Sequence, residues 1–583
     1  MANKRGSVYV AEIKTRYKEK VYTSYLLRRS YREDGKVKQQ TLGNLSALPP
    51  EAIAILRAAL HGQKYIPDYE ALEIRRSRQH GHVAAVGAML RRLELDRLLG
   101  PVPSDVRERL VALIIARVVA PASKLATARW WQNTTLSLVP AVGEASTDDL
   151  YEAMDHLLER QPSIERALAG RHLREGGLVL YDLSSSYVEG RCCPLAARRY
   201  NRDGKKGKEQ VNYGLVLDGE GRPISVQVYP GNTADPKTVA DQVDKLKKQY
   251  HLAHVVLVGD RGMLTSARIA DLRERGGIDW ISALRATDIQ ALADASAVSR
   301  SLFDQRDLVE IASPDYPGER LMVCRNPFLA DDRARTRKEL LAETQRLLDG
   351  LARRVAAGRL KQSSKIGAAL GRILHRFKVG KHFECEVSEG HFAYKRRDDR
   401  IQREAALDGI DIVRTSVPAT DLSDAATVAT YKSLQHAEQA FRNLKSVDMR
   451  LRPIRHWTER RVRAHIFLCL LAYYVQWHLR QTWAPYLFED QDPGRHVDDS
   501  VVRPALRSAA ALAKAHTKRT PDGEEVHSFA TLLAHLSGVV HNEVVVPAHP
   551  QIAPFAMITT PDPLQSKLFH LVGLGVRRQK HAG

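Results

Sequence analysis

The chain has 583 residues, with 89 Lys and Arg against 68 Asp and Glu, which gives a formal net charge of +21. This length is too great for one compact core, so three or four domains are expected. The excess of Lys and Arg over Asp and Glu favours a polyanionic partner over a neutral metabolite. A protein with a generally basic surface and no such partner has the same composition. The cysteines show no CxxC pair or His-rich spacing, which suits a reducing cytosol and argues against a disulfide framework and a structural zinc site.

The N-terminus has no apolar segment of the kind found in secretory signals. The most apolar stretch, Ala464 to Leu479, is too short and too closely preceded by arginines for a membrane span. It is better explained as a buried helix. We therefore expect a cytoplasmic, nucleoid-associated protein with no membrane partner.

Residues 1–60 are predicted to form a small basic β-hairpin unit. Val8–Ala11 and Val21–Leu27 have strand character, and Asp34-Gly35 is a typical hairpin turn before Lys36. The Arg and Lys content suits a DNA backbone, but a solvated hairpin without a partner explains the pattern equally well.

Residues 81–175 are predicted to be helical and to bind DNA. The expected helices are Val83–Leu93, Val106–Val119, Ser123–Trp131 and Asp148–Leu158, the last behind a Ser146-Thr147 cap. A helix-turn-helix fits within such a set, and a plain packing bundle fits it equally well.

Residues 176–300 have the most regular pattern and are predicted to be the first part of a catalytic core. The order is strand, hairpin, helix, strand, helix, strand: Gly177–Asp182, Val211–Leu217 with Ile224–Tyr229, Val239–Tyr250, His254–Asp260, Thr265–Arg275 and Asp279–Leu284. Such an order builds a mixed α/β sheet, with Asp182 and Asp260 leaving the C-terminal ends of its central strands. Ligands of open α/β sheets bind at that edge.

A third carboxylate comes from a predicted helix. Tyr431, Glu438 and Lys445 are spaced seven residues apart, nearly two helical turns, and the drift is only about 20° per heptad. The three side chains are therefore expected on one stripe of a single helix.

Two strand-end aspartates and a helical glutamate suit metal-dependent phosphodiester chemistry. Alone, each Asp is weak evidence, because Asp commonly ends strands as a turn former. Together with Glu438 they match the ribonuclease-H-like arrangement, in which hard oxygen ligands hold Mg²⁺. Two such ions about 4 Å apart would activate the attacking oxygen and stabilise the leaving one.

The motifs resemble the DDE transposases of bacterial insertion sequences, of the type with a Tyr-Arg-Glu-Lys helix. The matching segments are Asp182-Leu-Ser-Ser-Ser-Tyr187, Gly231-Asn-Thr, Asp260-Arg-Gly-Met263 and the Tyr431 to Lys445 helix. The resemblance implies that Asp182, Asp260 and Glu438 are catalytic metal ligands, and that Tyr431 and Lys445 contact the phosphates of the element ends. Leu434 occupies the position at which the family has the Arg of the Tyr-Arg-Glu-Lys helix. Arg442 is the alternative cation, and Asn232 and Asp235 are neighbours of the site.

The long stretch between Asp260 and Glu438 implies an α+β insertion domain over residues 301–405, followed by the second part of the core at 406–483 and a C-terminal helical tail at 484–583. The insertion is expected to contain strands, then helices, then strands: Asp307–Ala312, Arg320–Cys324, Asp332–Ala357, Ile366–His375 and Phe383–Arg397. Basic clusters at Lys395–Arg397, Arg450, Arg452, Arg455 and Arg460-Arg461 favour a DNA groove beside the helix that carries Glu438.

We therefore expect a DDE transposase that binds terminal inverted repeats, cuts with Mg²⁺ or Mn²⁺, with two ions in the site, and joins the freed end to target DNA. Holding two ends together implies a homodimer on double-stranded DNA. Two alternatives remain: a ribonuclease-H-like nuclease that cuts without joining, and a non-catalytic DNA-binding descendant.

Overall fold

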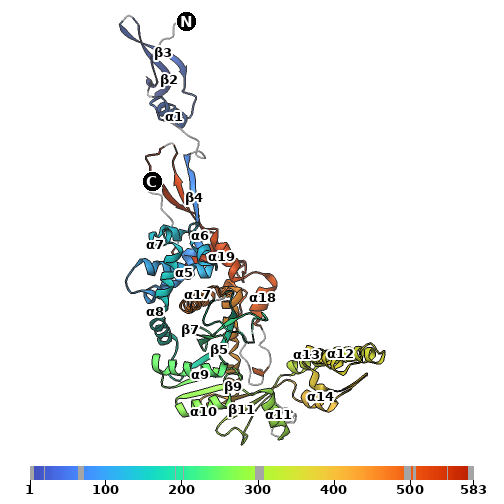
Figure 1. Ribbon diagram of the computed structural model, residues 1–583. Coiled ribbons are helices and arrows are strands. Elements are labelled where there is room, and N and C mark those ends of the chain that lie inside the picture. Colours follow the sequence, from blue (N-terminus) through green and yellow to red (C-terminus); the bar gives the residue numbers. More distant parts are fainter. Residues whose placement is uncertain are drawn as a thin grey trace. The chain divides into compact units, whose positions relative to one another are not determined.

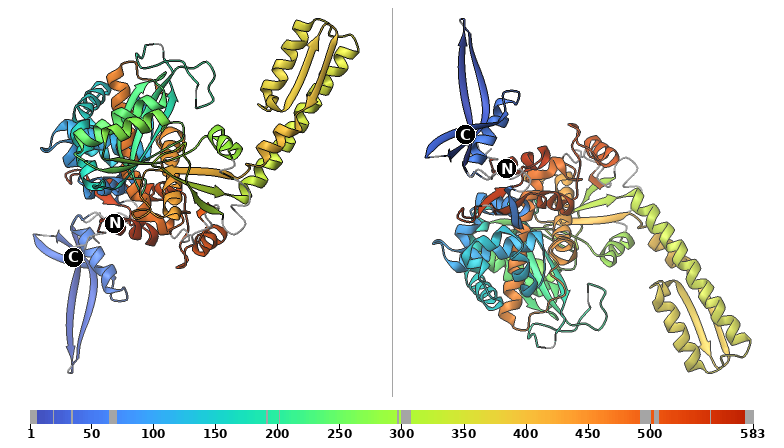
Figure 2. Two further views of the ribbon diagram at one scale, coloured as in Figure 1. Left: turned by 90° about the horizontal axis from the view of Figure 1, so that it is seen from below. Right: turned by 90° about the horizontal axis from the view of Figure 1, so that it is seen from above.

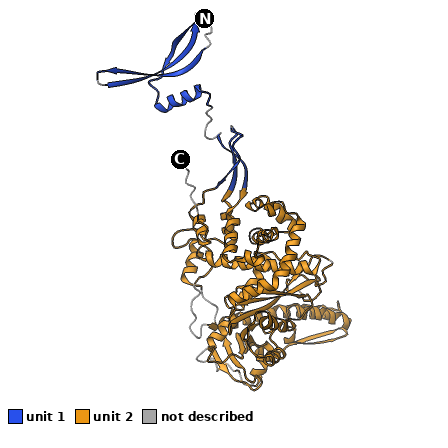
Figure 3. Cartoon of the chain, turned by 90° about the vertical axis from the view of Figure 1, so that its left-hand side faces the viewer, with its two compact units in different colours: residues 1–77, 541–558 blue, residues 78–540, 559–583 orange. Residues whose placement is uncertain are grey.

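The computed structural model describes residues 6–18, 20–33, 35–63, 71–190, 192–200, 202–295, 298, 307–491, 501–502, 507–547 and 549–575. The chain divides into two compact units (Figure 3). Unit 1 contains residues 1–77 and 541–558, and unit 2 contains residues 78–540 and 559–583.

The described residues of unit 1 include two small sheets and the helix α1. Strands β1 (Ser7–Tyr17), β2 (Lys20–Glu33) and β3 (Lys36–Asn44) form an antiparallel meander, followed by α1 (Pro50–Leu60). Gly35 has φ +73°, as a tight turn between β2 and β3 requires. Asp34 of the predicted turn lies outside the described residues. The N-terminal segment is thus a three-stranded antiparallel unit, which agrees with the predicted strands and the predicted turn before Lys36.

The second sheet of unit 1 adds two strands, β15 and β16, to the helical tail predicted at 484–583. Strands β15 (Val540–Val545) and β16 (Phe555–Ile558) pair with each other and with β4 (Glu73–Gln79), in the order β16-β15-β4. Ser77 Oγ donates to Asn542 Oδ1 at 2.6 Å across this sheet. The pairing joins the two ends of the chain, a contact that local periodicity does not reveal.

Unit 2 begins with a helical region. It contains α3 (Gly81–Arg92), α4 (Leu95–Leu99), α5 (Asp105–Val119), α6 (Lys124–Trp131), a 3-10 turn (Thr135–Leu138), α7 (Pro140–Gly143) and α8 (Thr147–His172). Ser146 and Asp149 form a capping box at the start of α8. This helix continues through Pro162 to His172, well beyond the predicted end at Leu158, because one face packs into the core at Leu150, Leu157 and Leu168.

An eight-stranded mixed sheet forms the centre of unit 2 and confirms the predicted mixed α/β class (Figure 1). Its order is β10-β11-β14-β9-β8-β5-β6-β7. The strands are β5 (Leu178–Tyr187), β6 (Gln210–Asp218), β7 (Pro223–Pro230), β8 (Val255–Gly259), β9 (Ile278–Ala283), β10 (Leu308–Ile311), β11 (Arg320–Arg325) and β14 (Ile410–Thr415). Strand β8 runs parallel to β5 and β9, and the other pairings are antiparallel.

Helices connect and cover these strands. They are α9 (Asp235–Asp244), a π-helical turn η2 (Lys245–Gln249), α10 (Ser266–Arg275), α11 (Ala286–Asp294), α15 (Asp424–Lys432), α16 (Gln435–Arg442) with the π-helical turn η5 (Asn443–Val447), and α17 (Glu459–Trp483). Most side chains of α17 between Val462 and Leu479 are buried, because the helix packs against α5, α8 and β7. An apolar helix buried on all sides is the expected outcome for this composition, so the predicted buried helix is confirmed.

The insertion is smaller than predicted. Strands β10 and β11, expected within it, pair in the central sheet through β14. Between β11 and β14 lie α12 (Pro327–Ala356), α13 (Ser363–Arg376), a 3-10 turn (Gly380–His382), β12 (Phe383–Ser388), β13 (His391–Arg396) and α14 (Asp398–Ala405). The β12–β13 hairpin packs along α12 and α13 with its own apolar core, which includes Leu348, Ile366 and Phe392 (Figure 2).

The C-terminal helices of unit 2 are α18 (Ala509–Thr517), α19 (Phe529–Ser537) and α20 (Pro563–Leu571), after a 3-10 turn at Ala484–Tyr486. Leu536 and Leu568 are buried in the same core as α17. Among the described residues no single helix is long and apolar enough to cross a membrane; α5 and α6 meet that criterion only as a pair bent by 98°.

Candidate active site

Asp182 and Asp260 lie at the same level of two neighbouring parallel strands, Asp182 within β5 and Asp260 directly after β8. Strand β5 pairs in parallel with β8 up to the partners Tyr181 and Gly259, so the two aspartates are the next residues on each strand. Asp260 follows the end of β8, as predicted. Asp182 does not end its strand, because β5 continues to Tyr187 through its antiparallel pairing with β6. The predicted meeting of the two acids at one edge holds, although the strand boundary was wrong.

The helix carrying Glu438 is not continuous with Tyr431 and Lys445, contrary to the prediction. α15 ends at Lys432, and α16 starts at Gln435 after a turn in which the Ser433 hydroxyl donates to the Thr430 carbonyl at 2.6 Å. Such a serine bond competes with the helical ladder. Beyond Arg442 the backbone forms the π-helical turn η5, which changes the angular position of Lys445. The seven-residue spacing therefore does not produce a single stripe.

Packing of α16 on the sheet positions Glu438. Phe441, one turn after Glu438, packs edge-on against Tyr213 of β6 with ring centroids 5.7 Å apart. The Tyr213 hydroxyl is within hydrogen-bond distance of Ser186 Oγ, at 2.9 Å, on β5. This buried contact fixes α16 over the strand that carries Asp182.

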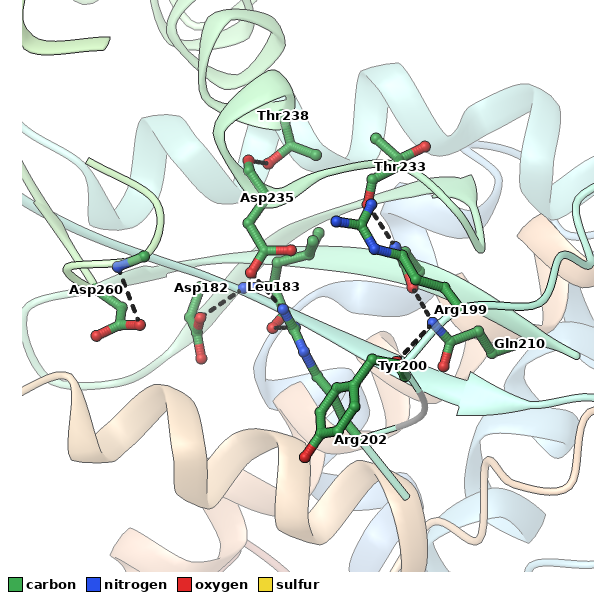
Figure 4. Close-up of polar contacts among 12 residues, drawn as sticks. Asp182, Leu183, Arg199, Tyr200, Arg202, Gln210, Thr233, Asp235, Thr238 and Asp260 are labelled. Carbon is green, nitrogen blue, oxygen red and sulfur yellow. Dashed lines mark hydrogen bonds and ion pairs between the residues drawn. The ribbon is translucent and has the colours of Figure 1, made fainter. Parts of the chain in front are cut away.

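Asp182, Asp260 and Glu438 line one pocket of about 310 Å³, together with Asp235 and Arg202. We call it the carboxylate pocket. Four carboxylates from β5, the end of β8, the start of α9 and α16 thus face one space. Figure 4 shows Asp182 between Asp260 and Arg202, with Asp235 paired to Arg202. The structure brings together all three predicted acids, and Asp235, predicted as a neighbour of the site, lines the same pocket.

Few groups within the protein compensate the negative charges of the predicted triad. Asp182 Oδ1 accepts from the Leu183 amide at 2.7 Å, and Asp260 Oδ2 accepts from the Gly262 amide at 3.4 Å. Among the described residues none of the three acids forms an ion pair with Lys, Arg or His. Burial raises the pKa of Asp182 to about 7, although the Leu183 amide and Arg202 oppose this shift.

The donor set of the pocket suits a hard divalent cation. Carboxylate oxygens are the preferred ligands of such ions, and a bound cation would offset the cost of burying charge at Asp182. Within the described part of the chain, however, no group of three or more His, Cys, Asp or Glu side chains is arranged to hold a metal ion directly. The pocket therefore has the right chemistry for metal ions without a preformed set of three ligands.

The structure places Tyr431 and Lys445 in two different environments. Tyr431 is half-buried, and burial together with the nearby Asp260 charge raises its phenol pKa. Lys445 is buried, and its Nζ lies 3.1 Å from Asp203 Oδ1. Arg452 also pairs with Asp203, whose other oxygen accepts from the Tyr187 amide at 3.2 Å. Lys445 thus fastens the loop that carries Asp203 to the sheet.

Arg442 is exposed and has no ion-pair partner among the described residues, whereas several predicted DNA-contacting arginines are already paired. Arg455 pairs with Glu189 at 3.2 Å, and Arg460 pairs with Asp155 at 3.3 Å. Asn232 is exposed, and its backbone carbonyl accepts from Arg199 at 2.6 Å. The basic clusters after Glu438 are therefore partly internal to the fold.

The sequence analysis missed the loop between β5 and β6. Its described residues 192–200 and 202–208 carry six cations: Arg198, Arg199, Arg202, Lys205, Lys206 and Lys208. Arg202 pairs with Asp235 and donates to the Leu183 carbonyl, which places its guanidinium in the wall of the carboxylate pocket. The high density of cations between two core strands is the sequence feature from which this loop could have been predicted to be part of the site.

Comparison with known proteins identifies the class of this enzyme. The model of the transposase DDE domain matches residues 177–475, just over half of the chain. The chain belongs to the DDE transposase family, whose members cleave DNA, transfer its strands and depend on divalent metal ions.

The N-terminal region identifies the type more closely. Residues 10–68 match the N-terminal domain of the IS1634 family transposases, so this is a DDE transposase of the bacterial insertion-sequence type. A search of curated proteins found no significant match. Among solved structures, a piggyBac transposase synaptic complex with hairpin DNA aligns over 78% of this chain and 76% of that chain, with 10% identity and a TM-score of 0.34.

Proposed function

We propose that this transposase binds the terminal inverted repeats of its insertion sequence and uses Asp182, Asp260 and Glu438 as the acidic residues of DNA cleavage and strand transfer. One observation carries this assignment: the three carboxylates line a single pocket at the end of the parallel strands, and none has an ion-pair partner among the described residues. We also assign the core to the ribonuclease-H-like fold, on the basis of this placement of acids.

The three acids would hold Mg²⁺, with Mn²⁺ as a substitute and two ions in the site. Bound ions of this kind activate the attacking oxygen and stabilise the leaving oxygen in an in-line displacement. The protein supplies the ligand oxygens from three rigid elements, and the packing of Phe441 on Tyr213 holds α16 in place. Asp182, with its pKa raised to about 7, must release its proton before it can act as a ligand.

Cations around the pocket would hold the DNA backbone. Arg442 is the exposed guanidinium next to Glu438 on α16, and Tyr431 lies near Asp260. We propose that Arg442, Tyr431 and Asn232 contact the DNA directly. Lys445 acts on DNA indirectly, through the loop that it anchors at Asp203. Synapsis of two element ends would require a homodimer on DNA.

The test is cleavage and strand transfer on a labelled duplex that carries the terminal repeat, with Mg²⁺ or Mn²⁺. The wild type should cut and join, whereas Asp182→Ala, Asp260→Ala and Glu438→Ala should bind the duplex but do neither. Exposed Glu274 of α10, outside the pocket, provides a control variant, Glu274→Ala, that should remain active. Retained activity in any triad variant would refute the assignment, and cutting without joining would identify a nuclease.

A further inference from the structure

Strand β16 is an open, apolar edge of the second sheet of unit 1. In the order β16-β15-β4 it pairs only with β15 among the described residues. All four of its residues are exposed, and the exposed fractions of Phe555, Met557 and Ile558 are 39%, 43% and 52%. Natural proteins protect open edges with charged side chains or with a cover, because an open edge pairs readily with another strand. An unprotected apolar edge therefore indicates an interaction surface.

The edge at β16 is also uncharged. From Pro550 to Pro561 the sequence contains no Asp, Glu, Lys or Arg, although 27% of the whole chain is charged. The opposite edge strand of the same sheet, β4, carries exposed Arg75 and Arg76. The outer strands β1 and β3 of the other sheet likewise carry exposed lysines. A strip without cations is a poor surface for DNA, so a polypeptide suits it better.

The charge of the whole chain favours a second copy as that polypeptide. Two copies with a net charge of +21 repel one another over most of their surface. Repulsion is weakest where both surfaces are uncharged, and there the burial of apolar side chains favours association. A two-fold dimer joins the same patch of both copies, so the strip must be complementary to itself.

The backbone of β16 meets this requirement. The Thr559 N–H donates to the Val540 carbonyl at 2.9 Å, and the same register places Met557 opposite Asn542. Hydrogen-bonded pairs alternate along an antiparallel ladder, so Ala556 and Ile558 direct their N–H and C=O groups away from β15. Beside an antiparallel copy of the same strand, Ala556 faces Ile558 of the partner subunit. These two residues then exchange both of their backbone bonds.

We propose that two copies of this transposase pair through β16, antiparallel about a two-fold axis at Met557. In this register Met557 faces Met557 of the partner subunit. Pro554 and Pro561 flank the paired residues and end the ladder, because proline has no N–H to donate. The proposal rests on the proposed function, since synapsis of two element ends calls for two copies, and it names the surface through which they meet.

The small size of this interface sets the expected strength of the dimer. Each copy contributes one strand of four residues. Interfaces that bury less than about 1,200 Å² in total are typical of weak or transient association. We therefore expect a weak dimer without DNA, which covalent capture and measurement over a range of concentrations both detect.

Disulfide cross-linking of the full chain tests the register. The Met557 pair is of the non-hydrogen-bonded type, in which Cα atoms lie about 4.5 Å apart, within the range of a disulfide. Met557→Cys, in a background that carries Cys192→Ser to remove an exposed thiol, should form a covalent dimer on mild oxidation. Phe555→Cys is the matched control, with similar exposure on the same face. The two copies of residue 555 would lie about 13 Å apart, too far for a disulfide.

The yield of covalent dimer should be at least about tenfold higher for Met557→Cys than for Phe555→Cys. Equal yields from the two variants would indicate random collision and would refute the register. No covalent dimer from Met557→Cys would refute the interface.

A proline at the edge tests the backbone bonds. Ile558→Pro removes an outward N–H and spares the bonds between β16 and β15, so the sheet should remain folded. Analytical ultracentrifugation without DNA should show a Kd of dimerisation raised at least about tenfold, because each dimer loses two backbone bonds. Ile558→Val keeps the N–H and should stay within about threefold of the wild type. Equal weakening by both variants would contradict backbone pairing, and a wild type that is monomeric at every concentration would leave the strip to a different polypeptide.

The interface and the proposed function fail in different ways. A wild type that cuts and joins the terminal-repeat duplex, together with a Met557→Cys variant that does not cross-link, refutes the interface alone. Cross-linking of Met557→Cys, together with a wild type that does not cut, refutes the proposed function alone.

Discussion

Two carboxylates of unit 2, Asp182 and Glu165, differ in how their charge is compensated. Glu165 of α8 is 1% exposed, and Lys245 Nζ lies 2.6 Å from its Oε2. Its Oε1 accepts from the Val226 amide at 3.0 Å and from Gln161 at 2.8 Å. Asp182 accepts one bond from the adjacent Leu183 amide and has no ion pair among the described residues.

The comparison shows which kind of buried acid indicates a functional site. The contacts of Glu165 join α8 to β7 and η2, so its charge is balanced within the fold and its role is structural. Asp182 faces a pocket, and burial raises its pKa to about 7. An acid left uncompensated beside a pocket is therefore a candidate ligand for a group from outside the chain.

The largest effect should come from Asp182→Asn, which removes the ligand charge and keeps the shape of the side chain. Cleavage of the terminal-repeat duplex should fall at least about a thousandfold, because metal stabilisation contributes several kcal/mol. Duplex affinity should remain within about threefold of the wild type, since Arg442 and the cations of the β5–β6 loop are intact. Residual cleavage within tenfold of the wild type would exclude Asp182 from the triad.

The same variant should be more stable than the wild type without metal. The pKa of Asp182 is raised from 3.8 to about 7, so the native state retains its proton where the unfolded state has lost it. Asp182 therefore costs stability progressively as pH rises from about 4 to about 7, and fully above that. Thermal unfolding in EDTA should show a higher Tm for Asp182→Asn at pH 8 and no difference at pH 4. A lower Tm at pH 8 would contradict this.

The next largest effect is expected for Lys245→Met, which leaves the Glu165 carboxylate buried without its cation. Removal of one partner from a buried pair costs about 3–5 kcal/mol, so the apparent stability in urea unfolding should drop by that order. The double variant Glu165→Gln/Lys245→Met keeps an acceptor for the Val226 amide and should recover most of the loss. If the double variant is no more stable than the single one, unpaired charge is not the cause.

Lys124→Met should have a smaller, stabilising effect that depends on pH. Lys124 is 3% exposed, with its Nζ 3.5 Å from His465 Nδ1. Burial, assisted by the Arg117 charge, lowers its pKa from 10.5 to about 7. The His456 ring lies 4.8 Å from that of His465, and the Cys469 thiol is also near, so no carboxylate among these neighbours offsets the ammonium.

The direction in which stability changes with pH follows from proton binding. Between pH 7 and 10.5 the unfolded state binds the proton and the native state does not, so stability rises with pH through this window. Below pH 7 the full cost is present. Lys124→Met should therefore stabilise the protein by about 2 kcal/mol at pH 6, with a gain that shrinks towards pH 10. Chemical unfolding of the wild type and of Lys124→Met at pH 6 and pH 10 measures this gain in stability. A gain that does not depend on pH would point to packing as its cause.

The sequence predicted much of the sheet because apolar strands and turn residues are local signals. It placed Asp260 at a strand end and identified the buried α17. It failed where pairing partners are remote. Residues Ser184 to Ser186 look like a loop, but pairing with β6 makes them strand. Likewise, the bonds that link Asp203 to Lys445 and Arg452 join segments far apart in the chain, so the anchored loop was not predicted.

The smallest expected effect separates an exposed ion pair from the buried Glu165 and the half-buried Asp182. Arg455 and Glu189 are 3.2 Å apart, with side chains 71% and 40% exposed. Arg455→Ala should change stability by no more than about 1 kcal/mol, because solvent screens such pairs. Since Glu189 already engages the guanidinium, the dependence of duplex affinity on salt should also stay that of the wild type. A decrease of about one in the slope of log K against log salt would instead show that a phosphate displaces Glu189, which would return Arg455 to the DNA groove predicted from the sequence.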